Sequence, residues 1–164
     1  MSAPFLLAKS DNMLQAQFTE SFHHARHYRC LINGVLTVAE NQFKGHPWAI
    51  MINWGGSFIQ IPEEEKLCMQ FLHEYYKAGL KYLVNVTPSH PIVEWQMQKI
   101  SKANPQVEIF TTDSVEAGEQ WLQQRNINIE TDKAEISEDW YKKTKAFSGM
   151  VEKYGIDKQK FDSP

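Results

Sequence analysis

Between residues 48 and 86, apolar and polar positions follow the order strand, helix, strand. Residues 49–52 are a continuous apolar run, as in a strand that is buried on both faces. After them, apolar side chains recur every three or four positions, the spacing of one helix face: Leu67, Phe71, Leu72, Tyr75 and Ala78. Residues 82–86 form a second buried run. The pattern therefore predicts a βαβ unit with a right-handed crossover.

The helix of this unit has sequence signals at both ends. Pro62 suits the first helical position, where its missing N–H costs nothing, and the glutamates at 63–65 face the positive end of the helix dipole. Gly79 can adopt the left-handed conformation that ends a helix. We expect the helix to run from Pro62 to Gly79.

The N-terminal region predicts a β-hairpin followed by an ambiguous segment. Residues 5–9 and 13–18 are strand-like and are separated by turn chemistry at 10–12. Residues 20–43 have apolar positions at helical spacing, but Asn33-Gly34 is also a common hairpin dipeptide. We favour a helix that tolerates Gly34 at a cost of roughly 1 kcal/mol.

Downstream residues add a helix, a strand and two further helices. Residues 92–100 have helical spacing and Asn104-Pro105 ends that helix; residues 107–110 predict a strand. Asp113 and Glu116 form a capping box for the next helix. Trp95 and Trp121 are expected to pack between helices and sheet.

We predict an α/β domain over residues 1–130, with a mixed sheet of about five strands and with about four helices. For residues 131–164 we expect a C-terminal amphipathic helix and a loose tail.

Composition narrows the possible functions. The chain is 42% apolar and 23% charged, typical of a soluble globular protein. Its net charge of −3, without a basic block, argues against nucleic acid as a partner. The apolar run at residues 5–8 is too short for a signal peptide or a membrane span. Cys30 and Cys68 form no disulfide framework, so we expect a cytoplasmic protein.

The order of predicted elements resembles the STAS fold of anti-sigma-factor antagonists and, more closely, bacterial STAS-like (SEC14-like) proteins of uncharacterised function. The resemblance covers residues 5–125 and is carried by four stretches: 47–54, 62–63, 107–110 and 116–122. It implies a non-enzymatic, regulatory, protein-binding domain. STAS antagonists have a phosphorylatable serine at the start of the helix after the central strand. Here Ser57 lies several residues before Pro62, which weakens the implication of a phosphorylation switch.

Three loops should meet at the carboxyl ends of the parallel strands, where open α/β sheets bind ligands. They carry the candidate binding residues Trp54, Gly55, Gly56, Ser57, Ser89, His90 and Asp113. A serine, a histidine and an aspartate allow a hydrolytic triad. However, no Gly-x-Ser-x-Gly elbow surrounds the serine, and Asp113 is expected to cap a helix. We therefore predict no catalytic residues and no cofactor.

A metal site is a weaker alternative. His23 and His27 are four residues apart, with Glu20 one turn earlier, so a helix would place all three on one face. Two imidazoles and a carboxylate can bind a divalent metal. No fourth ligand is evident, so a solvated helix face is the simpler interpretation.

The last predicted helix carries an apolar stripe that includes Trp140. It can pack on its own domain, or dock on a second subunit or another protein. We predict a protein-binding or regulatory module that contacts another protein, or itself, through the three loops and this helix. The alternatives are a small-ligand or lipid-binding domain with an apolar pocket at the same loops, or a metal-dependent or hydrolytic enzyme.

Overall fold

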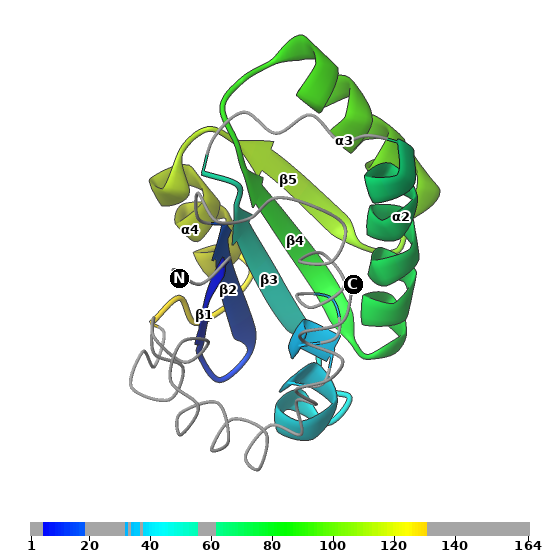
Figure 1. Cartoon of the computed structure of the whole chain (residues 1–164). Coiled ribbons are helices and arrows are strands. Elements are labelled where there is room, and N and C mark those ends of the chain that lie inside the picture. The colour runs from blue at the N-terminus through cyan, green and yellow to red at the C-terminus, as the bar shows by residue number, and fades with distance from the viewer. Residues whose placement is uncertain (1–4, 19–31, 33, 37, 56–61, 131–164) are drawn as a thin grey trace.

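The computed structural model describes residues 5–18, 32, 34–36, 38–55 and 62–130. Within them, one mixed sheet has the strand order β1-β2-β3-β4-β5 (Figure 1). The strands are β1 (Phe5–Lys9), β2 (Met13–Phe18), β3 (Trp48–Asn53), β4 (Leu80–Val86) and β5 (Glu108–Thr112). β1 and β2 form the predicted antiparallel hairpin, and every later pairing is parallel. The α/β fold class is confirmed.

The helices cover the two faces of the sheet unequally. α2 (Pro62–Lys77) and α3 (Pro91–Ala103) pack on one face, and α4 (Val115–Gln123) packs on the other (Figure 1). Each strand from β3 to β5 lies beside the previous one, so successive right-handed crossovers put α2 and α3 on the same face. α4 follows β5 and returns across the opposite face.

The described part of the ambiguous segment is helical. Residues 32, 34–36 and 38 are α-helical and lead into a π-helical turn, η1 (Ala39–Phe43). The turn ends at Lys44, which has a left-handed conformation and donates its N–H to the Ala39 carbonyl. The alternative interpretation, a hairpin turn at Gly34, is wrong. Val35, Val38 and Ala39 are buried on one helical face. Residues 20–31 lie outside the described part.

The central βαβ unit begins and ends much as the sequence predicts. α2 starts at Pro62, and its last residue, Lys77, is followed by a turn in which Gly79 has φ of +107°. A Cβ atom at Gly79 would lie 2.9 Å from the His46 carbonyl oxygen. At this turn, the Trp48 indole N–H donates to the Ala78 carbonyl at 3.1 Å. Gly79 is thus required both by its backbone conformation and by close packing.

Two predictions about the later helices are wrong in detail. Ser114, not Asp113, caps α4: its hydroxyl accepts the Ala117 N–H at 3.1 Å, while Asp113 is exposed. Both residue types are good caps, so the sequence did not distinguish them. Trp95 is 57% exposed instead of packed against the sheet. The buried face of α3 is formed by Val93, Gln96, Met97 and Ile100.

The residues after α4 are part of the described domain. Ile127 is buried on the α4 side of the sheet. The Ser10 hydroxyl donates to the Asn128 carbonyl at 2.7 Å, and the Asn128 N–H donates to the Asn12 side chain. These bonds join Asn128 to the β1–β2 turn. None of the helices in the described part is long and apolar enough to cross a bilayer.

Candidate functional site: the carboxyl end of the sheet and the α3–β5 groove

The loops after β3, β4 and β5 meet, as the sequence predicts. The Trp54 N–H donates to the Val86 carbonyl, and the Thr87 N–H donates to the Thr112 carbonyl, each at 2.9 Å. These bonds extend the pairing of the strands into the loops. Gly56 and Ser57 lie outside the described residues, so the structure does not place these two candidates.

Trp54 is a buried residue of this region. Its side chain is 5% exposed, its ring meets Phe18 edge-on at 4.6 Å, and its indole N–H donates to the Asn85 side chain at 3.1 Å. Gly55 is exposed, has φ of +76° and donates its N–H to the Asn53 side chain. Trp54 thus offers little surface to a ligand, whereas Gly55 provides the turn above it.

Ser89 and His90 organise the start of α3. The Ser89 hydroxyl donates to a Glu94 carboxylate oxygen at 2.8 Å. His90 caps the helix, its Nδ1 accepting the Ile92 N–H at 3.2 Å. An accepting Nδ1 carries no proton and cannot donate to an aspartate as a triad histidine does. Asp113 leads into α4 on the other face of the sheet. In this arrangement, Ser89 and His90 have structural roles.

Two buried polar side chains lie at the end of β4. Asn85 accepts from Trp54 and contacts the Met97 sulfur at 3.4 Å through its amide nitrogen. Thr87 is 4% exposed, and its hydroxyl oxygen is buried without a hydrogen-bond partner among the residues that the structure describes. Such a group costs about 1–3 kcal/mol unless water or a ligand satisfies it. The sequence signal for both residues is a polar side chain within or directly after a buried apolar run.

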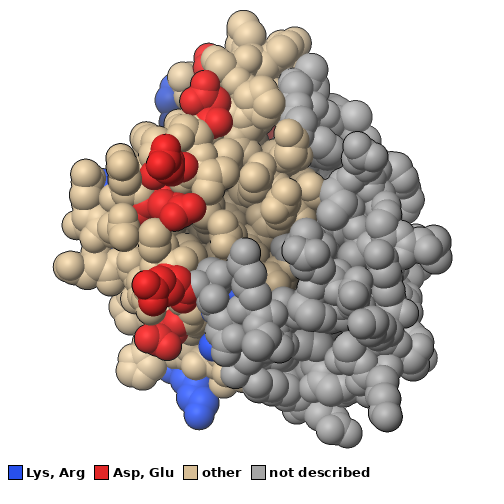
Figure 2. All heavy atoms as spheres, turned by 90° about the vertical axis from the view of Figure 1, so that its left-hand side faces the viewer, with Lys and Arg blue, Asp and Glu red and all other residues tan. Residues whose placement is uncertain are grey.

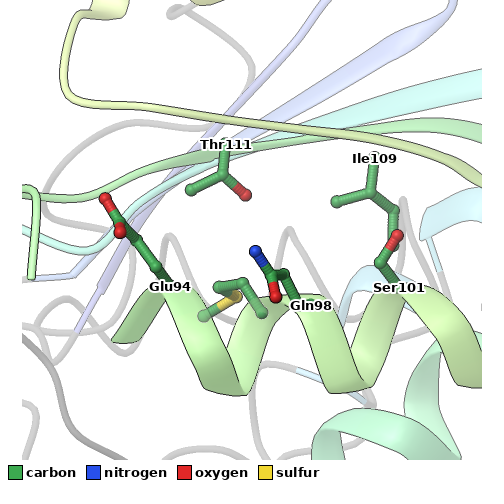
Figure 3. Close-up of a pocket in the computed structure, with 6 residues that line it drawn as sticks. Glu94, Gln98, Ser101, Ile109 and Thr111 are labelled. Carbon is green, nitrogen blue, oxygen red and sulfur yellow. The ribbon is translucent and has the colours of Figure 1, made fainter. Parts of the chain in front are cut away.

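A groove between α3 and β5 was not predicted from the sequence. It has a volume of about 350 Å³ and six lining residues: Glu94, Met97, Gln98, Ser101, Ile109 and Thr111. Figure 3 shows the α3 side chains pointing toward β5, and those of β5 pointing back toward α3. A weak signal was present, since the polar residues at 94, 98 and 101 share one helix face.

Charge is distributed unevenly over the opposite side of the molecule. Acidic side chains form a column on the side where α4 lies (Figure 2). α4 itself carries Glu116 and Glu119 and no basic residue. Just beyond it, Arg125 lies 3.7 Å from the centre of the Trp121 ring and forms an ion pair with Glu108. The guanidinium thus covers Trp121 at this surface.

The remaining candidates lie outside the described residues: Glu20, His23, His27 and Trp140. Within the described part, no three histidine, cysteine or acidic side chains are grouped closely enough to hold a metal ion. Comparison with protein-family models, curated proteins and solved structures finds no match to this chain. The chemistry of the site is therefore inferred from its geometry.

Proposed function

We propose that the chain is a non-enzymatic, STAS-like module that binds another protein through a surface at the start of α3. The observation that carries the proposal is the exposure of two large apolar side chains there. Ile92 is 47% exposed and Trp95 is 57% exposed, directly after the loop that contains Ser89 and His90. Tryptophan in particular contributes much of the binding energy at protein interfaces.

The environment of Trp95 supports a contact role. The Lys99 ammonium lies 4.5 Å from the centre of the Trp95 ring and also pairs with Glu65 of α2. The ring thus has a cationic neighbour and still remains 57% exposed. A side chain that already makes a contact before binding loses less entropy on binding, which favours Trp95 as an anchor.

Two observations support the broader assignment. The order of the described elements along the chain agrees with the element order on which the STAS resemblance rests. A cytoplasmic location is part of the proposal, because two cysteines provide no disulfide framework. The bacterial source is part of it only through the STAS-like resemblance. A partner protein is favoured over nucleic acid, because the formal net charge is −3.

The test compares two exposed aromatic residues. The tagged full chain, Trp95→Ala and Tyr76→Ala are purified from the cells that naturally produce the protein, and bound proteins are quantified by mass spectrometry. Tyr76, on α2, is 44% exposed and is the matched control. We expect a stoichiometric partner with the unchanged chain and with Tyr76→Ala, reduced roughly tenfold or more by Trp95→Ala. Equal recovery with all three chains, or no partner with any, would overturn the proposal.

A further inference from the structure

β5 presents free main-chain groups at one edge of the described sheet. It is the last strand in the sheet order, and it pairs with β4 on one side only. The Thr112 carbonyl accepts the Thr87 N–H, so the main chain of Thr112 faces β4. Main-chain groups alternate in direction along a strand. Ile109 and Thr111 therefore direct their N–H and C=O groups to the open edge.

The same two residues line the α3–β5 groove with their side chains. On the facing helix, Glu94, Gln98 and Ser101 point toward β5 (Figure 3). Neither the Gln98 amide nor the Ser101 hydroxyl has a hydrogen-bond partner within the described residues. An open strand edge gives affinity through main-chain bonds, and adjacent pockets select alternate side chains. In this molecule the open β5 edge and the α3–β5 groove lie side by side.

We propose that the β5 edge accepts an extended, basic segment of a partner protein as an additional strand. Main-chain hydrogen bonds form with Ile109 and Thr111. A lysine or arginine side chain of the segment enters the groove and pairs with the Glu94 carboxylate, one oxygen of which already accepts from Ser89. The proposal rests on the protein-binding role proposed above, and it adds a second surface and the chemistry of its occupant.

Charge favours a basic segment over a second copy of the chain. Glu94 is the charged residue among those that line the groove. The nearby Glu108 is already paired with Arg125, at 3.6 Å. A second copy would bring another β5, with the sequence EIFTT, and so no cation to Glu94. It would also bring together two chains that each have a formal charge of −3.

The proposal is tested with a heptapeptide phage library selected on the tagged full chain. We expect enrichment of peptides without proline that alternate β-branched residues with lysine or arginine. The most enriched peptide is then synthesised with a fluorophore, and its affinity is measured by fluorescence anisotropy. Failure of any peptide to enrich, or enrichment without basic residues, would overturn the proposal.

Two variants locate the binding site of the synthetic peptide. Thr111→Pro removes an outward N–H at an edge position that tolerates proline, and should weaken binding about tenfold. Glu94→Gln should weaken it several-fold and remove the preference for lysine over glutamine in the peptide. Glu116→Gln on α4 changes the net charge equally and should have no effect. Equal affinities of the Glu94 and Glu116 variants would contradict the proposal.

Two further measurements guard against misfolding and alternative occupants. If Thr111→Pro does not fold, amide hydrogen exchange of the unchanged chain, with and without the peptide, tests the binding site instead. The bound peptide should slow exchange of the Ile109 and Thr111 amides. A dimer in native mass spectrometry that Thr111→Pro converts to monomer would assign the edge to a second copy and overturn the proposal. Trp95→Ala should leave peptide binding intact, so failure of the α3 surface and failure of the β5 edge are separate results.

Discussion

The two faces of the sheet differ in how their aromatic side chains are buried. On the α2–α3 face, Trp48 is fully buried, is stacked on Phe43 at 5.5 Å and lies 5.7 Å from Tyr75. On the α4 face, Trp121 is stacked on Phe110 at 5.4 Å but is only partly buried, and Arg125 covers it. Similar ring contacts thus form a closed core on one face and a solvent-accessible cluster on the other.

The residues that should contribute most to stability therefore differ from the exposed residues proposed for binding. The α2–α3 face buries the larger apolar cluster, so most of the hydrophobic stabilisation should arise there. The α4 face is held by a smaller cluster and by close approach of the helix to the sheet at Gly118. The exposed candidates for binding, Trp95 and the β5 edge, lie at the outer margins of the larger core. Their substitution should therefore affect binding more than folding.

The largest expected effect is the loss of Trp48. Trp48→Ala removes a fully buried indole and its hydrogen bond to Ala78, and should lower the free energy of unfolding by about 4 kcal/mol. Trp121→Ala, on the other face, should cost about 2 kcal/mol because the ring is partly exposed. Urea unfolding of both variants measures the difference. Equal losses would show that the two faces contribute alike.

A smaller effect is expected from a methyl group on the α4 face. A Cβ atom at Gly118 would lie 2.8 Å from a Val84 methyl carbon and 3.2 Å from the Met51 sulfur. Gly118→Ala should therefore cost about 1–2 kcal/mol in spite of the better helix propensity of alanine. Gly34→Ala is the control, because a Cβ there meets nothing within 4 Å. It should stabilise the protein by about 0.5–1 kcal/mol in the same urea titration.

Alkaline pH should weaken the α2–α3 face through Tyr75. Burial, and secondarily the Cys68 thiol, raise the pKa of this phenol well above its ordinary value. The unfolded chain releases the proton near pH 10 while the folded chain still holds it. Stability is thus complete below about pH 10 and falls above it, by roughly 1.4 kcal/mol per pH unit, until the folded phenol also ionises.

Tyr75→Phe isolates this contribution, although it also removes the 3.3 Å bond from the hydroxyl to the Ile32 carbonyl. The variant should lose less stability between pH 9 and 11 than the unchanged chain, as measured by urea unfolding at each pH. Parallel pH profiles for the two proteins would exclude Tyr75 as the source.

The smallest effect concerns Thr87, whose hydroxyl has no hydrogen-bond partner within the described part of the chain. Thr87→Val replaces it with a methyl group of similar shape and should stabilise the protein by up to about 1 kcal/mol. Thr112→Val is the contrasting change, since the Thr112 hydroxyl accepts the Ser114 N–H, and should cost about 1 kcal/mol. Destabilisation by Thr87→Val in thermal unfolding would instead indicate that water or a ligand satisfies the Thr87 hydroxyl.

The sequence predicted the strands of the central unit and the start of α2 well, because their signals are local. A continuous apolar run, a proline at the first helical position and a glycine after the last turn act through the conformation of their own backbone. It also predicted that the loops after β3, β4 and β5 meet, since the carboxyl ends of parallel strands share one edge. It did not predict which tryptophan would be exposed, because both have polar or glycine neighbours: Trp54 follows Asn53 and precedes Gly55, and Trp95 lies between Glu94 and Gln96.

By itself, the sequence determined the α/β class, the N-terminal hairpin and the boundaries of the central helix. The tertiary structure decided which face of α3 is buried, and so left Ile92 and Trp95 exposed and Gln96 inside. It also placed the polar face of α3 beside the open edge of β5. Neither result could be predicted locally, because each depends on the position of a helix relative to strands that are distant in sequence. Periodicity defines the faces of a helix, but only packing selects the face that meets the sheet.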